Sequence, residues 1–239
     1  ELNRVFPEAR VLRMDADTTR NKEGHEKILE IFASGKADIL VGTQMIVKGH
    51  DFANVTLVAA LAADLSLFEQ DFRSNERTFD LLTQAAGRAG RGLKPGKMII
   101  QTRHPDEYAI RCSKNQDYIG FYEQEAAYRR MVKYPPASHM LMVCMQSDRA
   151  EELERQAEVY KKYIDDVALT FDDDKIRVVG PVEAYIYKVK DVYRKVIYVK
   201  HDEYQLLISI KNDIESEIKD GRLSSRISTY FDFDPMTIF

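Results

Sequence analysis

Short apolar runs alternate with helix-length amphipathic segments over the first hundred residues, and this alternation constrains the fold more than any other feature. The runs have the length and apolar character of buried parallel strands and lie at residues 11–15, 37–43, 55–63 and 97–102. Segments with the apolar spacing of helices lie at residues 22–33 and 76–86. Strands that alternate with helices predict a doubly wound α/β layer, whose ligands bind at the carboxyl ends of the strands.

The pattern changes after a helical stretch that begins at about residue 104. The KYPP sequence, Lys133 to Pro136, should end that stretch, because consecutive prolines have fixed φ angles and no amide donors. The elements that follow have the order βαββαβ, with strands expected at residues 139–146, 175–180, 192–200 and 226–233. This order predicts a ferredoxin-like sandwich. We therefore predict an α/β domain at residues 1–135, with a helical linker from about 104, and a smaller α+β domain at 136–239.

Three details of the smaller domain follow from local patterns. Asp148 is expected to cap the first helix, which should run to about Val167. Pro181 and a connecting loop are expected between the second and third strands. In the last strand, the alternate residues expected to share one side are Ile227, Thr229, Phe231 and Phe233.

Two arginines stand three residues apart in the octapeptide QAAGRAGR, Gln84 to Arg91, which we call the arginine motif. Arg88 and Arg91 are permanently charged bidentate donors, and the small residues around them allow a polyphosphate to approach closely. Arginines at a helix carboxy terminus can also simply offset the helix dipole. The flanking glycines favour the phosphate site, because glycine weakens a helix without improving its packing.

About forty residues upstream, the segment GTQMIVKGHDF, Gly42 to Phe52, places polar residues directly after a buried strand. The polar residues are Thr43, Gln44, Lys48, His50 and Asp51. A glycine-bounded turn is the simpler interpretation, but a turn requires fewer polar side chains than these. Both this segment and the arginine motif follow strands at the expected ligand-binding edge of the sheet.

In this order and spacing, the two motifs resemble the fifth and sixth signature motifs of superfamily-2 helicases, which lie in the second of two RecA-like lobes. More narrowly, the chain resembles the primosomal protein N′ (PriA) family of bacterial replication-restart helicases, essentially end to end. The segments that carry this resemblance are RVLRMDADTT, ILVGTQMIVKGHDF, residues 64–79, QAAGRAGRG and KYPP. Ala53 and Ala137 depart from the proline and phenylalanine expected there. The resemblance implies a RecA-like parallel-sheet second lobe followed by a DNA-binding α+β domain.

The resemblance also implies roles for individual residues. Arg91 would be the arginine finger facing the γ-phosphate, and Arg88 would be a second phosphate contact. The other residues on the ATP-binding side would be Gly49, Asp51, Gln84 and Gly87. Thr43 and Gln44 would contact the DNA backbone. Lys48 would contact either the DNA or the nucleotide, and His50 would hold its neighbours in position.

In the smaller domain, the sequence AYIYKVKDVYRK interleaves tyrosines with basic residues. Such a mixture suits single-stranded DNA, because rings stack on bases and cations contact phosphates. The candidate DNA-binding residues are Tyr187, Lys188, Lys190 and Arg194. A strand pair with packed tyrosines and solvated lysines is the alternative, and the resemblance to a DNA-binding domain favours the first interpretation.

The segment LSLFEQDFRSNER lies between the two motifs and contains Phe68, Phe72, Arg73 and Arg77. One interpretation makes it a sensor that couples DNA occupancy to the ATP site, with its aromatic rings stacked on bases. The other makes it a surface loop held by two core phenylalanines. The sequence leaves both interpretations open.

Two elements of a complete motor of this class are missing from the sequence. No GxxxxGK[ST] phosphate loop occurs, since the two GK dipeptides are followed by alanine and methionine. Cys112 and Cys144 stand too far apart for a CxxC pair, so no metal ligands are expected here, although the resemblance implies zinc in the intact protein. We interpret the chain as a carboxy-terminal fragment that lacks both the phosphate loop and the magnesium-binding motif and is inactive alone, whereas the intact protein binds ATP and magnesium.

Charge and composition limit the classes of partner. The net charge is −4, and residues 140–239 hold 15 basic against 20 acidic residues, so DNA contact requires a local patch. No apolar run long enough for a bilayer occurs, and two cysteines suit a reducing compartment, so we expect a cytoplasmic, nucleoid-associated bacterial protein.

By resemblance, the intact protein would be an ATP-dependent 3′-to-5′ DNA helicase that binds stalled replication forks and restarts replication by primosome assembly. Its partners would be forked and single-stranded DNA, single-stranded-DNA-binding protein and primosome proteins. Two other interpretations remain at this stage. The chain could belong to another superfamily-2 helicase or translocase, or to a non-enzymatic DNA- or protein-binding module.

Overall fold

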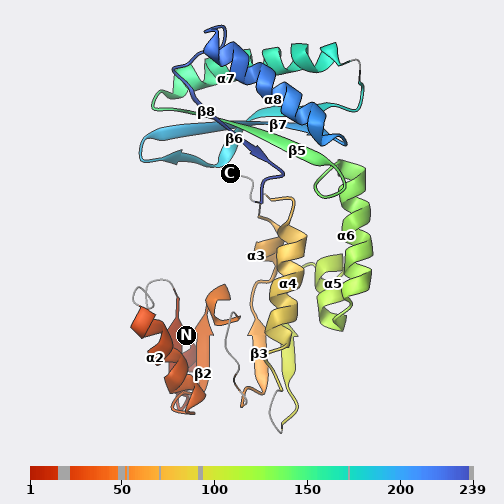
Figure 1. Ribbon diagram of the computed structural model, residues 1–239. Coiled ribbons are helices and arrows are strands. Elements are labelled where there is room, and N and C mark those ends of the chain that lie inside the picture. The colour runs from red at the N-terminus through yellow and green to blue at the C-terminus, as the bar shows by residue number, and fades with distance from the viewer. Residues whose placement is uncertain are drawn as a thin grey trace. The chain divides into compact units, whose positions relative to one another are not determined.

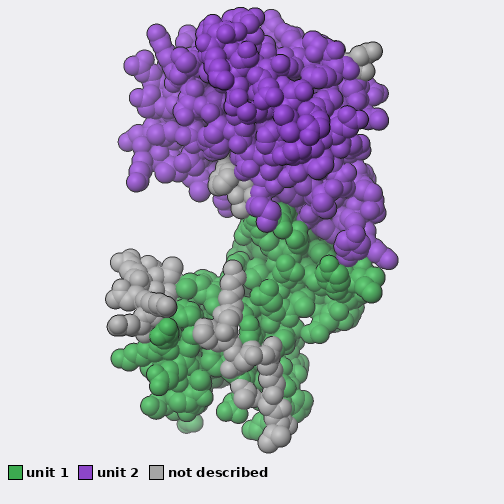
Figure 2. Space-filling view, in the orientation of Figure 1, with its two compact units in different colours: residues 1–69, 73–121 green, residues 70–72, 122–239 purple. Residues whose placement is uncertain are grey.

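The computed structural model describes residues 1–15, 22–47, 52, 54–69, 71–90, 94–171 and 173–236 (Figure 1). The chain divides into two compact units, coloured separately in Figure 2. Unit 1 comprises residues 1–69 and 73–121, and unit 2 comprises residues 70–72 and 122–239. The sequence Lys133 to Pro136, where we expected a domain boundary, therefore lies inside unit 2, because most of the preceding helix, from Tyr122 on, belongs to that unit.

Unit 1 begins with a short helix, α1 (Leu2–Val5), and a βαβ unit. The βαβ unit consists of β1 (Val11–Met14), α2 (Lys22–Ala33) and β2 (Ile39–Gly42), followed by the 3-10 helix η1 (Gln44–Val47). β1 and β2 pair in parallel, as the apolar runs predict. Met14, Leu29 and Phe52 form the buried centre of this part.

A second parallel pair follows the same plan. It consists of β3 (Leu57–Ala60), α3 (Asp64–Leu67), α4 (Ser74–Ala86) and β4 (Lys97–Ile100). Over the described residues, no ladder joins β2 to β3, so the two pairs form separate sheets rather than the single layer that we predicted. The difference arises because each strand pairs with the strand joined to it through a helical crossover.

Two helices complete unit 1 and lead into unit 2. α5 (Tyr108–Asn115) ends at Gln116, which is in the left-handed region at φ 52°. α6 (Tyr118–Val132) begins where Asp117 accepts a 2.9 Å hydrogen bond from the Gly120 amide, which caps the helix.

Unit 2 has the predicted βαββαβ order. Its elements are β5 (His139–Ser147), α7 (Ala150–Thr170), β6 (Arg177–Val189), β7 (Val192–His201), α8 (Tyr204–Lys219) and β8 (Ser228–Phe233). The four-stranded sheet has the order β6-β7-β5-β8, and every pair is antiparallel. This arrangement confirms the ferredoxin-like sandwich.

The two faces of this sheet bury different side chains. α7 and α8 cover one face (Figure 1), where Leu141, Val143 and Ile197 pack against the helices without solvent exposure. The alternation predicted for the last strand is confirmed, because Ile227 and Phe231 belong to this core. The opposite face carries Met140, Met142, Cys144, Val196 and Tyr198, against which Phe72 and Tyr134 pack.

Two local predictions for unit 2 are wrong. α7 begins at Ala150 with Arg149 at its N-cap position, so Asp148 is not the capping residue. β6 continues through Pro181 to Val189, where we expected a loop. The strand accommodates proline because its register with β7 shifts between Val179 and Val182, and a bulge needs no ladder amide at that point.

Candidate nucleotide and DNA site

The arginine motif begins on the last turn of α4 and continues past its end. Gln84 is exposed on that turn, and Gly87 follows the last helical residue with helical backbone angles. The Arg88 amide donates to the Ala85 carbonyl at 3.0 Å, which tightens the chain into a 3-10-type turn. Arg88 therefore emerges directly beyond the helix, and its side chain is half-buried.

The Arg88 side chain joins the two motifs. Its Nε donates to the backbone carbonyl of Val47 at 3.1 Å, across 41 residues of sequence. Val47 ends η1, which begins directly after Thr43. This bond brings the two motifs together, but only Thr43 and Gln44 follow the carboxyl end of a strand.

The arginine motif lies instead beside residues that precede β3 and β4, because the Gly90 amide bonds to the Val55 carbonyl and Gly90 approaches Gly96. The prediction that both motifs lie at the carboxyl ends of strands is therefore wrong for the arginine motif. The remaining candidates in the two motifs, Lys48, Gly49, His50, Asp51 and Arg91, lie outside the described residues.

Two glycines hold the end of the arginine motif close to β4. The Gly90 amide donates to the Val55 carbonyl at 2.9 Å, and Gly90 has a φ of 78°. A Cβ atom at Gly96 would lie 2.2 Å from the Gly90 nitrogen. The two backbone segments can approach this closely only because both positions are glycine. This approach fixes Gly90, two residues after Arg88, beside the start of β4.

Thr43 and Gln44 lie at the carboxyl end of β2, as the sequence predicts. The side chains of both residues are exposed. The backbone is ordered by a 3.2 Å hydrogen bond from the Ile46 amide to the Thr43 carbonyl. A hydroxyl and an amide are thus presented together on a fixed turn, where they can donate to phosphate oxygens.

A carboxylate also lies at the end of β3, but it has a structural role. Asp64 accepts hydrogen bonds from the Thr102 hydroxyl and from the Arg103 amide. These donors lower the pKa of the Asp64 carboxyl group, the Thr102 hydroxyl most strongly. The interactions tie the start of α3 to the residues that follow β4.

The candidate DNA-binding residues of unit 2 surround the hairpin between β6 and β7. Lys190 and Asp191 form its two-residue turn, both with positive φ. The Lys188 ammonium group lies 2.8 Å from an Asp191 oxygen and 4.8 Å from the centre of the Tyr193 ring. Tyr187 contacts the same ring at 5.4 Å between centroids. Lys188 and Tyr187 are therefore held within the hairpin.

Arg194 lies on the other face of the sheet. Along β7, Tyr193 packs with the helix-covered core, whereas Val196 and Tyr198 belong to the opposite face. Because side chains alternate along a strand, Arg194 shares the face of Val196, and it stands opposite Gln146 of β5. Its Nε atom is buried without a hydrogen-bond partner among the described residues. The four candidates thus do not form one continuous surface.

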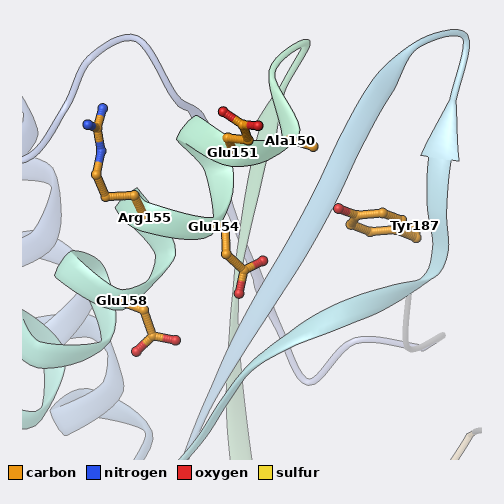
Figure 3. Close-up of a pocket in the computed structure, with 6 residues that line it drawn as sticks. All are labelled: Ala150, Glu151, Glu154, Arg155, Glu158 and Tyr187. Atoms are coloured by element: carbon orange, nitrogen blue, oxygen red, sulfur yellow. The ribbon is translucent and has the colours of Figure 1, made fainter.

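Tyr187 also lines a groove beside the amino-terminal half of α7 (Figure 3). The groove has a volume of about 480 Å³, and its lining residues are Ala150, Glu151, Glu154, Arg155, Glu158 and Tyr187. Glu154 is paired with the buried Lys195 ammonium group. With Glu154 neutralised by Lys195, the two other carboxylates, Glu151 and Glu158, face the single cation Arg155. This leaves a small excess of negative charge, which disfavours a phosphate backbone on this side of Tyr187.

Membrane-spanning helices and metal sites can be assessed for the residues that the structure describes. There, no helix combines the length and apolar character that crossing a bilayer requires. No three histidine, cysteine, aspartate or glutamate side chains in the same ranges lie close enough to hold a metal ion. Cys112 and Cys144 are buried thiols in different units, and burial raises the pKa of Cys144.

Comparison with known protein families matches both halves of the chain. Residues 2–92 match the helicase conserved C-terminal domain, and residues 130–236 match the primosomal protein N C-terminal domain. The chain belongs to the PriA family. The RecA-like second lobe and the following domain that the sequence predicts are confirmed by these matches.

Individual PriA relatives agree with the family assignment. Replication restart protein PriA of Bacillus subtilis is 46% identical over 90% of this chain and 26% of the relative. The Synechocystis protein of that name is 36% identical over 99% of the chain and 27% of the relative. The Chlamydia pneumoniae protein is 35% identical over 100% of the chain and 31% of the relative. The chain thus spans about a quarter to a third of the length of these PriA proteins.

Two aspects of the site were not predicted from the sequence. The sequence predicts that Arg88 binds phosphate, but it does not predict the bond of Arg88 to the Val47 carbonyl. Tyr134 was interpreted only as part of the sequence that ends a helix, yet its ring packs against the sheet of unit 2. The only feature of the sequence that could have indicated this packing is an aromatic residue directly before two prolines, and that feature does not show which residues the ring contacts.

Proposed function

We propose that this chain is the carboxy-terminal part of an ATP-dependent 3′-to-5′ DNA helicase that binds stalled forks and restarts replication. The observation that carries the proposal is the bond from Arg88 to the Val47 carbonyl. It joins the arginine motif to the segment that presents Thr43 and Gln44. A residue proposed to contact the ATP phosphates is thus hydrogen-bonded to the segment proposed to contact DNA. The match to the helicase C-terminal domain supports this interpretation.

In this proposal, ATP binds between two lobes, and this chain supplies the arginine side of the cleft. Arg91 stabilises the charge that develops on the transferred phosphoryl group, and Arg88 makes a second phosphate contact. Gly49, Asp51, Gln84 and Gly87 shape the same side. We assign no residue of this chain to magnesium or zinc, because its sequence has neither a phosphate loop nor a cysteine pair, and no step is derived through either metal.

On the DNA side, Thr43, Gln44 and Lys48 contact the backbone, and unit 2 binds forked or single-stranded DNA. Relative motion of the two lobes during ATP turnover then becomes stepping along the strand. Single-stranded-DNA-binding protein and primosome proteins complete the partners, in the cytoplasm beside the nucleoid. The names of the relatives, which are replication restart proteins, support this assignment.

Two other functions fit less well. Another superfamily-2 helicase or translocase would share the match at residues 2–92, but the match at residues 130–236 favours the restart family. A non-enzymatic DNA- or protein-binding module would not need Arg88 held directly beyond a helix and next to Gly87. An intact phosphate loop in the full-length protein would eliminate this second alternative.

The function is tested by comparing the intact protein with the 239-residue chain. We expect the intact protein to hydrolyse ATP faster when forked DNA is added and to unwind duplexes in the 3′-to-5′ direction. The 239-residue chain should show no DNA-stimulated hydrolysis, because it lacks a phosphate loop. Turnover by this chain, or an intact protein without DNA-stimulated hydrolysis, would refute the proposal.

The hairpin of unit 2 is tested by the salt dependence of DNA binding. Replacing Lys188, Lys190 and Arg194 with alanine in the intact protein should weaken single-stranded DNA binding. The slope of log affinity against log salt should fall by about 0.7 for each phosphate that is no longer neutralised. Replacing the exposed Lys162 of α7 with alanine is the charge-matched control and should leave the slope unchanged. Equal slopes for the triple variant and wild type would instead favour a solvated strand pair.

A further inference from the structure

The segment 70–72 belongs to unit 2, although the residues on both sides of it belong to unit 1. Phe72 therefore comes from the sequence between the two motifs, yet it packs with the carboxy-terminal domain. Phe72 is half-buried and lies, with Tyr134, against the sheet face that carries Met140 and Tyr198. This face is opposite to the one that α7 and α8 cover.

Two aromatic rings and two cations form the contact, which we call the Phe72 cluster: Phe72, Arg129, Tyr134 and Lys200. The Phe72 and Tyr134 rings are stacked, with centroids 4.9 Å apart and planes 12° apart. The Arg129 guanidinium carbon lies 5.3 Å from the centre of the Phe72 ring, and the Lys200 ammonium nitrogen lies 3.5 Å from that of Tyr134. Each ring thus carries a cation at a distance typical of cation–π attraction.

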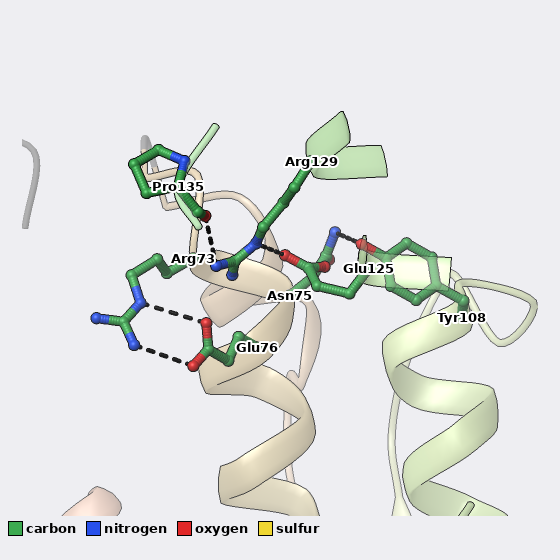
Figure 4. Close-up of polar contacts among 7 residues, drawn as sticks. All are labelled: Arg73, Asn75, Glu76, Tyr108, Glu125, Arg129 and Pro135. Atoms are coloured by element: carbon green, nitrogen blue, oxygen red, sulfur yellow. Dashed lines mark hydrogen bonds and ion pairs between the residues drawn. The ribbon is translucent and has the colours of Figure 1, made fainter. Parts of the chain in front are cut away.

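Both cations are held in place by other groups of unit 2. Arg129 Nε donates to Glu125 at 2.6 Å, and an Arg129 terminal nitrogen donates to the Pro135 carbonyl at 2.9 Å (Figure 4). Lys200 is 9% exposed, and burial lowers the pKa of its ammonium group to about 8. Because the cations are buried and fixed, Phe72 enters a preorganised site rather than a mobile surface.

The helix that follows Phe72 connects it to the arginine motif. α4 begins at Ser74 and ends at Ala86, two residues before Arg88. A helix of this length extends for about 20 Å and behaves as a stiff body. Its stiffness is reinforced within unit 1, where Phe79 stacks on Phe121 with ring centroids 4.2 Å apart.

The start of α4 is also fixed by polar contacts. The Asn75 amide nitrogen donates to the Tyr108 hydroxyl at 2.6 Å (Figure 4). Arg73 pairs with Glu76 at 3.0 Å in the first turn, as the same figure shows. Only the single residue Arg73 separates Phe72 from the helix. A displacement of Phe72 is therefore passed through covalent bonds to the start of α4, with little slack.

We propose that Phe72 is a positioning residue through which the carboxy-terminal domain controls the arginine motif. DNA bound by unit 2 sets the place of segment 70–72, α4 carries that placement to its other end, and Arg88 is moved relative to the phosphate site. The inference rests on the proposed function and adds the route by which DNA binding stimulates ATP hydrolysis. Phe72 touches neither substrate, so its effect is on coupling alone.

Two variants of the intact protein test this route. Phe72→Ala removes the ring from the cluster, and a Gly-Gly insertion between Phe72 and Arg73 keeps the ring but makes the connection flexible. For both variants, we expect the stimulation of ATP hydrolysis by forked DNA to fall about fivefold or more, as typical coupling energies imply. Hydrolysis without DNA and fork affinity without nucleotide should stay within about twofold of wild type, a change smaller than typical coupling produces.

A linkage measurement separates coupling from a structural effect. In the wild type, a non-hydrolysable ATP analogue should change fork affinity, and reciprocity requires fork DNA to change analogue affinity by an equal factor. In both variants this factor should approach one, although each ligand alone binds normally. A residue that only stabilises unit 2 would not change this factor.

Phe68→Ala is the matched control, because it removes a phenylalanine from the same segment. Phe68 is 66% exposed, belongs to unit 1 and contacts only the edge of His104 among the described rings, at 5.3 Å. It should keep wild-type coupling. If Phe72→Ala unfolds in a melting experiment, the insertion variant decides the question. Wild-type stimulation in the insertion variant overturns the proposal, whereas an unstimulated wild type would instead refute the function on which the proposal rests.

Discussion

Replacing Arg91 with alanine in the intact protein should lower DNA-stimulated ATP hydrolysis by about a hundredfold or more, as the loss of arginine fingers does in related motors. An arginine finger acts on charge that develops in the transition state, so its loss reduces turnover far more than nucleotide affinity. DNA unwinding should fall with the hydrolysis rate. The measurement is the rate at saturating ATP, beside fork affinity in the absence of nucleotide, which should remain near the wild-type value.

Arg91→Lys provides the conservative comparison. It should restore little activity, because an ammonium group cannot reproduce the planar two-pronged contact of a guanidinium group. A melting curve for each variant excludes misfolding as the cause of reduced activity. A folded Arg91→Ala protein that hydrolyses ATP at the wild-type rate would show that the arginine motif does not act at the phosphate.

Replacing Gly96 with alanine should both destabilise unit 1 and reduce ATP hydrolysis, although Gly96 touches no substrate. The new Cβ atom would lie 2.2 Å from the Gly90 nitrogen and 2.3 Å from the Ala89 carbonyl carbon. Backbone atoms cannot yield as a flexible side chain does, so we expect a loss of about 3 kcal/mol in the free energy of unfolding. A shift of about 1 Å in the arginine motif would lower hydrolysis on the order of a hundredfold.

Gly35→Ala is the control for the conformational freedom of glycine. Gly35 has a φ of 72°, but a Cβ atom there would meet nothing within 4 Å. Its replacement should therefore cost only the strain of an alanine in the left-handed region, about 1 kcal/mol, and should leave ATP hydrolysis unchanged. Chemical denaturation and steady-state kinetics measure both quantities. Equal effects of the two substitutions would mean that the contact between Gly90 and Gly96 is unimportant.

Local periodicity was sufficient to predict most helices and strands. The predicted helix at residues 22–33 coincides with α2 (Lys22–Ala33), and the predicted strand at 139–146 is one residue shorter than β5 (His139–Ser147). These predictions are correct because helical and strand spacing are properties of consecutive residues. The path of β6 through Pro181 was missed because a bulge depends on the partner strand, which local spacing does not describe.

The candidate site was only partly determined by the sequence. Arginine between glycines after a helix predicts a phosphate ligand at Arg88 from residue type alone, and that role stays a prediction. Its bond to Val47 depends on how two βαβ units meet, and so only the structure reveals it. The four DNA candidates in unit 2 are near neighbours in sequence, yet the hairpin and the alternation of β7 place them on different faces.

Phe68 and Phe72 illustrate the division between sequence and tertiary structure. The sequence determines that both are large apolar residues in one segment between the motifs. It does not determine which of them is buried, and the alternative in which both are core residues does not hold for Phe68, which is 66% exposed. Phe72 packs because Tyr134 and the face of the antiparallel sheet, from a distant part of the chain, meet it in space. Composition and spacing determine which residues can be buried, whereas long-range contacts decide which of them are.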